Sequence, residues 1–418
     1  GATSSPVRGG RDQGGGCAMD HAQPAVVLDC GSSYCKAGFA GDDAPGVTLP
    51  AAVAYLASAS VNSGPAEIKR LREGHVARSD REIADLLDRG VAKILRPTPG
   101  GLFDNFLDLE SLWRRAFADL GLQPQQLGRP VLVTEPPLSS TVQREMMTQV
   151  LFEDFGATAV HFAVSGALSL SANGDRTGLV VEIGGAVSQF VPVYEGFALP
   201  HAVRRLDIGG RTITDRLFDL IMGQQIARAP NQYGSPQAVR HACCSFKEQH
   251  CYVAQDFAQE FAQGCAGTGA RWIEIPPERT MKLPDGTEIQ VGTARFQAPE
   301  VLFDPASIGL EAGGVHDVAW DTMQACDVDV RQGLASNIVL AGGTMCMQGI
   351  QRRMQKEMRD LVPGRSLVKV VQSEAPRHSA FLGGSIVADL ANMRQKWFTE
   401  QEYFEQGVSA VHARCVSL

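Results

Sequence analysis

Two segments of this 418-residue chain share one pattern, which constrains the fold more than any other feature. VVLDCGS at 26–32 and LVVEIGG at 179–185 each contain three apolar residues, an acid, one further residue, a glycine and a small residue. Such a pattern is typical of a buried strand that ends in a tight turn. Because a chain of this length usually divides into two domains, the repeat predicts two halves that open in the same way.

Strands and helices alternate through the rest of the chain. Pro130–Thr134 and Asn337–Leu340 are apolar enough to form buried strands. Apolar periodicity and flanking turn residues predict helices at 139–152, 211–222, 236–263, 350–361 and 379–393. This alternation indicates an α/β fold with mixed sheets.

Segment 55–90 differs from its surroundings, because small residues give way to a strongly charged stretch. Ser79 followed by Glu82 is a capping-box signature for the start of a helix. An apolar stripe from Ile83 to Leu87 follows, and Gly90 is expected to end this helix.

Charge and cysteine usage argue against several classes of protein. The net charge is -8 and no basic stripe is present, so we expect no direct nucleic-acid ligand. The ten cysteines are scattered, so they are expected to be reduced thiols, and the cluster around Cys243–Cys251 fits no common zinc pattern. The longest uncharged run, 156–174, is too polar to predict membrane insertion. Residues 1–22 have the composition of a disordered N-terminal extension, in which Met19 reads as an initiator.

Three glycine-containing turns, each directly after an apolar strand, offer sites for phosphate groups. The chain has no Gly-Lys-Ser or Gly-Lys-Thr, which excludes a Walker-type NTPase. In Asp29–Lys36, backbone N–H groups can bind a polyphosphate, Lys36 adds a cation, and Asp29 can hold the water shell of a metal. The turns at 182–186 and 342–344 can hold the other side of the same phosphates. Each turn alone would equally suit an ordinary surface loop, so their combination carries the prediction.

Longer segments carry a resemblance to a known family. They include DCGSSYCKAGFAGDDAP (29–45), YEGFALPHAVRRLDIGGR (194–211), LAGGT (340–344), RMQKEM (353–358) and KWFTEQEY (396–403). In these segments and their order, the chain resembles actin from about Val26 to Cys415. The resemblance implies the actin fold, with two lobes, each built on a ribonuclease-H-like mixed sheet. It also implies ATP or ADP, with Mg²⁺ or Ca²⁺, in the central cleft.

The resemblance also implies the division of the chain. The first lobe is expected at 23–164, with 55–90 as its small outer subdomain, and the second lobe at 165–378. Residues 379–418 are expected to return to the first lobe.

The nucleotide-contacting residues are carried over by position from the same resemblance. They are Asp29, Gly31, Ser32, Ser33, Lys36, Gly184, Gly185, Lys247, Glu248, Gly342, Gly343, Thr344 and Arg377. Lys247 and Glu248 resemble an adenosine-contacting pair, although alone they would suit a solvated helix face. Arg377 stands where actins place a lysine near the base, and Asp29 is the expected metal-side acid, acting through water.

Departures from the actin pattern fall on the catalytic positions. Ser165 stands where actins place a glutamine that orients the attacking water, and its side chain is too short to reach that water. Glu182 is longer than the actin acid by a methylene, Gly185 replaces a second acid, and Gln189 replaces a histidine. Ser33 replaces a glycine of the phosphate turn, where its Cβ can crowd the backbone. We therefore expect a degraded ATPase site with little hydrolysis; rearrangement of Glu182 and Gln189 into a working site is the alternative.

The function implied is that of an actin-like nucleotide-binding protein of the cytoskeleton or of a larger actin-related complex. The alternatives are a conventional filament-forming actin ATPase and a nuclear chromatin-remodelling subunit. Expected partners are actin, actin-related and actin-binding proteins, in the cytoplasm and cytoskeleton or in the nucleus. Segment 55–78 is longer and more charged than the actin contact loop, which predicts poor polymerisation. The receiving groove is expected to keep apolar residues at Phe197, Val387, Leu390 and Met393, weakened by Ser171 and Lys396.

Overall fold

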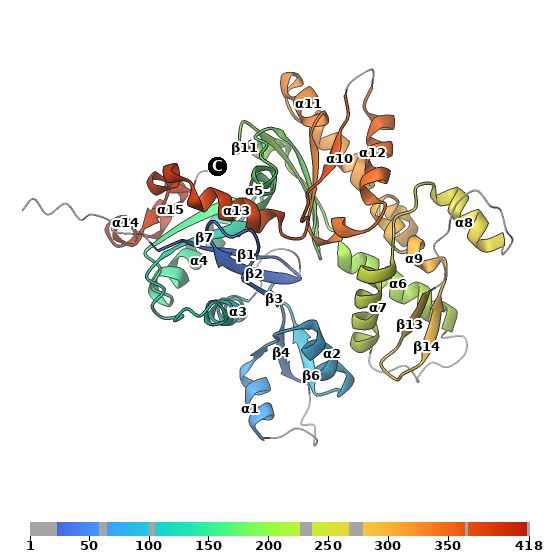
Figure 1. Cartoon of the computed structure of the whole chain (residues 1–418), viewed down its shortest axis with the longest axis horizontal. Coiled ribbons are helices and arrows are strands. Elements are labelled where there is room, and N and C mark those ends of the chain that lie inside the picture. The colour runs from blue at the N-terminus through green and yellow to red at the C-terminus, as the bar shows by residue number, and fades with distance from the viewer. Residues whose placement is uncertain are drawn as a thin grey trace, which may run out of the picture.

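The computed structural model describes residues 23–57, 65–98, 100, 105–225, 236–266, 279–363 and 367–415. Its strands form two large sheets and two small ones, and helices pack around them (Figure 1). The predicted N-terminal extension at 1–22 lies outside the described residues. Among the described residues, no helix combines the length and apolar character that a membrane-spanning segment needs.

The first large sheet is built around the apolar strand near the start of the chain. Its strands lie in the order β17 (Phe398–Thr399), β8 (Ala159–Val164), β7 (Pro130–Glu135), β1 (Val26–Cys30), β2 (Tyr34–Phe39) and β3 (Val47–Pro50). β1 forms an antiparallel hairpin with β2 and lies parallel to β7, which is parallel to β8. Alternate β1 residues point to opposite faces, so Val26 and Leu28 pack toward α3 (Phe106–Asp119) and α4 (Thr141–Glu153).

The second large sheet repeats this arrangement. Its strands lie in the order β11 (Phe197–Ala198), β10 (Ser188–Tyr194), β9 (Gly178–Ile183), β15 (Ile338–Ala341) and β16 (Val370–Gln372), and β12 (Arg204–Leu206) pairs with β10. β9 forms a hairpin with β10 and lies parallel to β15, which is parallel to β16. Since β9 and β1 hold the same place in the two sheets, the repeat predicted from 26–32 and 179–185 is confirmed. The α/β class with mixed sheets is confirmed as well.

Helices cover the outer face of the second sheet. They are α10 (Val315–Gln324), α11 (Val328–Ala335) and α12 (Ile350–Leu361). Buried side chains of these helices, including Met354, share one apolar cluster with Leu179 and Val181 of β9. The last helices, α14 (Glu400–Gln406) and α15 (Val411–Arg414), lie beside the first sheet (Figure 1).

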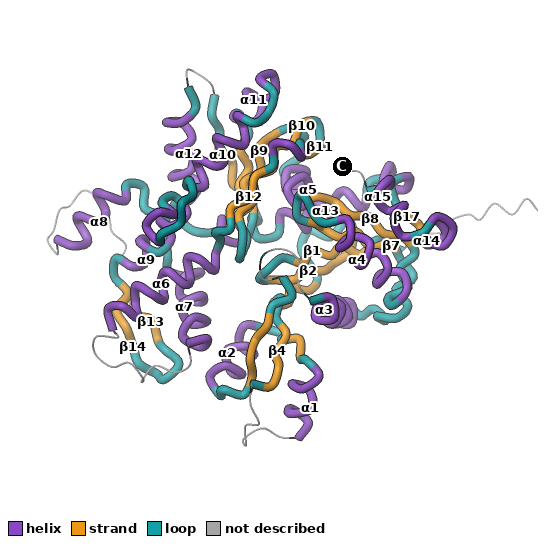
Figure 2. The backbone as a smooth tube through the Cα atoms, turned by 180° about the vertical axis from the view of Figure 1, so that it is seen from behind, coloured by secondary structure: helices purple, strands orange, loops and turns teal. Residues whose placement is uncertain are grey.

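Two helices pack against each other between the large sheets (Figure 2). They are α5 (Ser165–Ala172) and α13 (Ser379–Asp389). Their close approach depends on Gly383, where an added Cβ would lie 1.8 Å from the carbonyl oxygen of Leu168. The predicted lobe boundaries at 165 and 379 fall on the first residues of these helices; the assignment of lobes itself stays a prediction.

A small three-stranded sheet belongs to segment 55–90 and its flanks. β4 (Val53–Leu56) lies between β5 (His75–Val76) and β6 (Ala92–Leu95), next to α1 (Pro65–Glu73) and α2 (Asp80–Asp88). One half of the predicted capping box is present, because the Glu82 N–H donates to Ser79 Oγ. The other half differs, because the Glu82 carboxylate binds the Arg78 N–H and His75 in place of the Ser79 N–H. Helix α1 occupies much of the stretch expected to be a contact loop, and residues 58–64 of that stretch lie outside the described residues.

The second small sheet pairs β13 (Arg279–Lys282) with β14 (Glu288–Val291). Around it lie α6 (Gly210–Gln225), α7 (Pro236–His250), α8 (Phe257–Ala266) and α9 (Ala294–Gln297) (Figure 1). The single helix predicted at 236–263 is wrong. The chain leaves the helix after His250 because the N–H of Val253 donates to Gln348 and the N–H of Tyr252 donates to Arg295.

Two further expectations at the C-terminal side need correction. The helix predicted to reach residue 393 ends at Asp389, since Leu390 adopts an extended conformation before a short 3₁₀ turn at 391–395. Val387 and Met393 are buried in the core with Phe381 and cannot line a surface groove. Phe197 and Leu390 are exposed, as expected.

Candidate functional site: a cavity between glycine turns

A cavity of about 490 Å³ lies where the turns after β1, β9 and β15 meet. Its lining includes all thirteen residues expected to contact a nucleotide: Asp29, Gly31, Ser32, Ser33, Lys36, Gly184, Gly185, Lys247, Glu248, Gly342, Gly343, Thr344 and Arg377. Cavities of 300–1,000 Å³ are typical of small-molecule sites. The turns identified separately in the sequence therefore converge on one space of suitable size.

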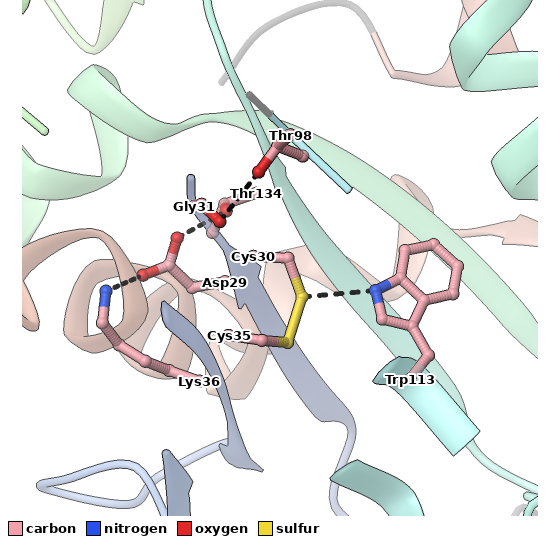
Figure 3. Close-up of a disulfide and its surroundings, with 8 residues drawn as sticks. All are labelled: Asp29, Cys30, Gly31, Cys35, Lys36, Thr98, Trp113 and Thr134. Atoms are coloured by element: carbon pink, nitrogen blue, oxygen red, sulfur yellow. Dashed lines mark hydrogen bonds and ion pairs between the residues drawn. A yellow bond between two sulfur atoms is a disulfide. The ribbon is translucent and has the colours of Figure 1, made fainter. Parts of the chain in front are cut away.

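The β1–β2 hairpin positions a paired acid and base at the mouth of its turn. Asp29 and Lys36 lie directly opposite each other across the two strands, and Lys36 Nζ lies 2.6 Å from Asp29 Oδ2 (Figure 3). The hydroxyl of Thr134, from β7, donates to Asp29 Oδ1 at 2.8 Å. A carboxylate has about four lone-pair sites, so Asp29 retains capacity for a further ligand such as metal-bound water.

The tip of this hairpin leaves two backbone N–H groups available. The turn is closed by the Gly31 N–H, which donates to the Tyr34 carbonyl at 3.0 Å. Within the described part of the chain, the N–H groups of Ser32 and Ser33 donate to no backbone carbonyl. The carbonyls of both serines are occupied: Arg211 Nη2 donates to Ser32, and Ala51 N and Arg96 Nη1 donate to Ser33. Available donors beside anchored carbonyls match an anion-binding turn.

The second and third turns are fastened to each other. The Thr344 hydroxyl donates to the Gly184 carbonyl at 2.9 Å, and the N–H of Gly210 donates to the same oxygen at 3.0 Å. Gly342 is required by conformation and by space, because its φ is +92° and a Cβ would lie 2.4 Å from the Ile183 carbonyl oxygen. These contacts fix the positions of both turns.

Gly185 is required for a different reason. Its φ lies outside the left-handed region, so its backbone could accept a side chain. A Cβ there would, however, lie 1.9 Å from Ser33 Oγ and 3.1 Å from Ser33 Cβ. The serine in the first turn and the glycine in the second are therefore sterically complementary, and the Ser33 hydroxyl fills the space that a side chain at 185 would occupy.

The residues expected at the catalytic positions do not converge on the cavity as a group. Ser165 Oγ, at the start of α5, donates to Glu182 Oε2 at 2.8 Å. Glu182 lines the cavity, and burial together with the Asp29 charge raises its pKa, an effect that the Ser165 hydrogen bond and Lys36 oppose. Gln189 is buried on β10, opposite Glu182 in the strand register, and is not part of the lining.

The predicted adenosine-contacting residues have two different environments. Lys247 is buried, and its Nζ donates to the Gly210 carbonyl at 2.8 Å and to Thr214 Oγ1 at 2.9 Å. Glu248 forms an ion pair with Arg377 at 3.1 Å. The Arg377 guanidinium lies 5.5 Å from the centre of the Tyr34 ring, so this pair reaches the tip of the first hairpin.

A disulfide joins Cys30 and Cys35, which corrects the expectation of reduced thiols throughout (Figure 3). The strand register places these residues directly opposite each other. The indole N–H of Trp113, from α3, donates to Cys30 Sγ at 3.3 Å. Six other cysteines are free thiols: Cys243, Cys244, Cys251, Cys326, Cys346 and Cys415.

Several lining residues were missed by sequence reasoning, chiefly because they come from other elements. Tyr34 donates its hydroxyl to Asp80 of α2 at 2.7 Å, and His241 of α7 contacts the Asp80 carbonyl. Arg96 follows β6, and Arg211 opens α6. Their only sequence signal is charge beside a strand or helix end, which many surface residues share.

Comparison with models of known protein families finds a match to the family described as Actin, over residues 20–416. The match contains every described element and all residues that line the cavity.

Proposed function

Because the chain belongs to the actin family, we propose that it binds ATP or ADP, with Mg²⁺ or Ca²⁺, in the cavity between the glycine turns and hydrolyses ATP slowly or not at all. Adenine nucleotide with a divalent cation is typical of this family. The observation that carries the binding half is the convergence of thirteen expected residues on one cavity.

The charge of the cavity supports an anionic ligand. Six lysines or arginines and five aspartates or glutamates line it, in a chain whose net charge is -8. Three of the basic groups are paired with acids: Lys36 with Asp29, Arg240 with Asp215, and Arg377 with Glu248. The guanidinium of Arg96, added to the available N–H groups of the first turn, favours phosphate.

Each part of the site has a defined task in this proposal. The Ser32 and Ser33 N–H groups hold phosphate oxygens, while Lys36 balances their charge. The Glu248–Arg377 pair borders the base. Asp29 holds the divalent cation through water, and the bound cation neutralises charge on the phosphates.

Slow hydrolysis is proposed from the environment of Ser165. Ser165 is not part of the cavity lining, and the hydrogen of its hydroxyl is donated to Glu182, so we expect it to contribute little to orienting a water molecule in the cavity. Gln189 lies outside the lining and cannot receive a proton from the cavity directly. A positioned acid, base or water-orienting group typically contributes about 10²–10⁴-fold to a rate, so the loss of one such group would leave a very slow ATPase.

As to cellular role, we propose an actin-like component of the cytoskeleton, or of a larger actin-related assembly, that polymerises poorly by itself. The exposed face of α1 is strongly charged and offers little apolar surface. Its partners would be actin-family and actin-binding proteins, in the cytoplasm or in the nucleus. Sedimentation in Mg²⁺, salt and ATP tests this: the protein should stay in the supernatant, and long filaments at micromolar concentration would contradict it.

Binding is tested by ATP-dependent stabilisation. ATP at 100 times its dissociation constant should raise the free energy of unfolding by about 2.7 kcal/mol. Lys36→Gln should abolish most of this gain, whereas Lys69→Gln, which removes the same charge from an exposed site on α1, should keep it. Equal loss in both variants, or no stabilisation of the unaltered protein, would contradict the proposal.

A further inference from the structure

Arg96 is a cation of the cavity that belongs to neither large sheet. It follows β6 of the small three-stranded sheet and lines the cavity beside the first turn. Its Nη1 lies 3.4 Å from the Ser33 carbonyl oxygen, at the outer limit of a hydrogen bond. Thr98, two residues later, donates its hydroxyl to the Gly31 carbonyl at 3.1 Å. The chain after β6 therefore holds the hairpin tip from the side.

A second guanidinium approaches the same tip from the opposite half of the molecule. Arg211, at the start of α6, donates to the Ser32 carbonyl. The two arginines are close enough to repel: burial and, second to it, the positive charge of Arg96 lower the pKa of Arg211 to about 10, against the opposing effects of Cys244 and Asp215. Like charges at a half-buried site are unfavourable unless an anion lies between them.

The described residues offer Arg96 no such anion. No aspartate or glutamate of the described chain lies within ion-pair distance of its guanidinium. Arg240 and Arg377, in the same cavity, each have a carboxylate partner. The planar fork of the Arg96 guanidinium suits two phosphate oxygens.

The position of Arg96 indicates that it would contact the phosphate end of the ligand and not the base. Its contact is Ser33, whose hydroxyl meets the second turn at Gly185. Arg96 thus lies where the two phosphate-binding turns approach each other. The Glu248–Arg377 pair, which we assign to the base, belongs to other elements.

We propose that Arg96 is a specificity residue that, with Arg211, binds the terminal phosphate and makes the cavity prefer a nucleoside triphosphate over a diphosphate. This inference rests on the proposed nucleotide binding. It also assigns the segment that follows the small three-stranded sheet a direct contact to the ligand.

The test compares ATP and ADP affinity in Arg96→Gln, by equilibrium titration with each nucleotide and Mg²⁺. A charge-assisted hydrogen bond corresponds to a loss of roughly tenfold or more, so ATP affinity should fall by about that factor. ADP affinity should change less than about threefold. Arg96→Lys, which keeps the charge but lacks the planar fork, should retain part of the preference. Lys93→Gln is the control, because Lys93 is exposed on the same strand and outside the lining.

Each other outcome overturns the inference. Equal losses of ATP and ADP affinity in Arg96→Gln would mean that the residue only supports the hairpin. Unchanged affinities would remove it from the site. If Arg96→Lys loses the whole preference for ATP, charge is not the cause. This result is judged against the unaltered protein, so it remains available if the Gln variant folds poorly. Absence of nucleotide binding by the unaltered protein would instead contradict the proposed function itself.

Discussion

The steric match between Ser33 and Gly185 leads to a prediction about two positions that must change together. Gly185→Ala should destabilise the protein, because the new Cβ would lie 1.9 Å from Ser33 Oγ, far inside the 3.4 Å of ordinary contact. Rotation of the hydroxyl cannot relieve this fully, since Ser33 Cβ is itself 3.1 Å away. Overpacking of this kind typically costs about 1–3 kcal/mol.

Ser33→Gly should remove most of that cost. Both close atoms of Ser33 disappear, and the nearest remaining neighbour is Ser32 Oγ at 3.2 Å. In this background, Gly185→Ala should cost less than about 1 kcal/mol, because an alanine also lowers the entropy of the unfolded chain. The coupling free energy between the two substitutions should therefore be about 1–2 kcal/mol.

The assay is a double-mutant cycle of urea unfolding without nucleotide, on the four proteins of the Ser33 and Gly185 set. Gly223→Ala is the control, since Gly223 is exposed in α6 with no atom near its Cβ position. That substitution should stabilise the helix by roughly 0.5–1 kcal/mol. If the Ser33 and Gly185 effects add within about 0.5 kcal/mol, the steric account of the paired residues is wrong.

Three other predictions concern stability. Reduction should lower the free energy of unfolding by about 2 kcal/mol, the value expected for the short loop closed by Cys30 and Cys35. The stability of Cys30→Ser should not respond to reductant, and equal sensitivity of this variant and the unaltered protein would contradict the disulfide. Burial lowers the pKa of His161 to about 4, so between pH 6.5 and 4 the unfolded state binds a proton that the folded state does not. The free energy of unfolding should therefore fall as pH falls through that window, by at most about 3 kcal/mol. Chemical unfolding of His161→Gln should show a correspondingly smaller loss, and a pH profile identical to that of the unaltered protein would refute the prediction. Arg353→Met should lower the free energy of unfolding by about 3–5 kcal/mol, measured by heat or urea. The guanidinium lies 2.8 Å from the buried Glu300 carboxylate, which the substitution leaves without its cation. A cost below about 1 kcal/mol would show that water reaches the site.

Patterns that repeat along the chain were sufficient to predict much of the architecture. The apolar–acid–glycine pattern predicted β1 and β9 as equivalent strands, because burial on both faces and a tight turn leave few other structures for it. The helix predicted at 350–361 was found with the same bounds. All thirteen positions expected to contact a nucleotide line one cavity. Their proposed role came from the resemblance to the actin family, residue by residue.

Features that depend on contacts between distant segments were not predictable. The break after His250 arises from hydrogen bonds to Arg295 and Gln348, which lie 43 and 95 residues further along the chain than their donors, and nothing local to the helix signals it. The Cys30–Cys35 disulfide follows from strand register, which spacing alone does not fix. Arg96 reaches the first turn only because β6 ends beside it.

The Ser165–Glu182 hydrogen bond shows where reasoning from single residues was incomplete. Each residue was identified as a departure from the family pattern, with a separate consequence for catalysis. The two side chains form one unit, in which the longer acid reaches the hydroxyl of the shorter side chain at 2.8 Å. This pairing uses the donor hydrogen of the serine, and it supports slow hydrolysis together with the absence of Ser165 from the cavity lining.

The most direct test of the central claim measures bound nucleotide and phosphate release on one preparation of the full chain. After gentle purification in Mg²⁺, denaturation should release close to one adenine nucleotide per chain. Incubated with excess ATP, the same protein should release phosphate more slowly than polymerising actin, with most bound nucleotide remaining ATP. Absence of any nucleotide, in the purified protein and after incubation with ATP, would contradict the binding claim. Phosphate release at or above the actin rate would contradict the account of Ser165, Glu182 and Gln189.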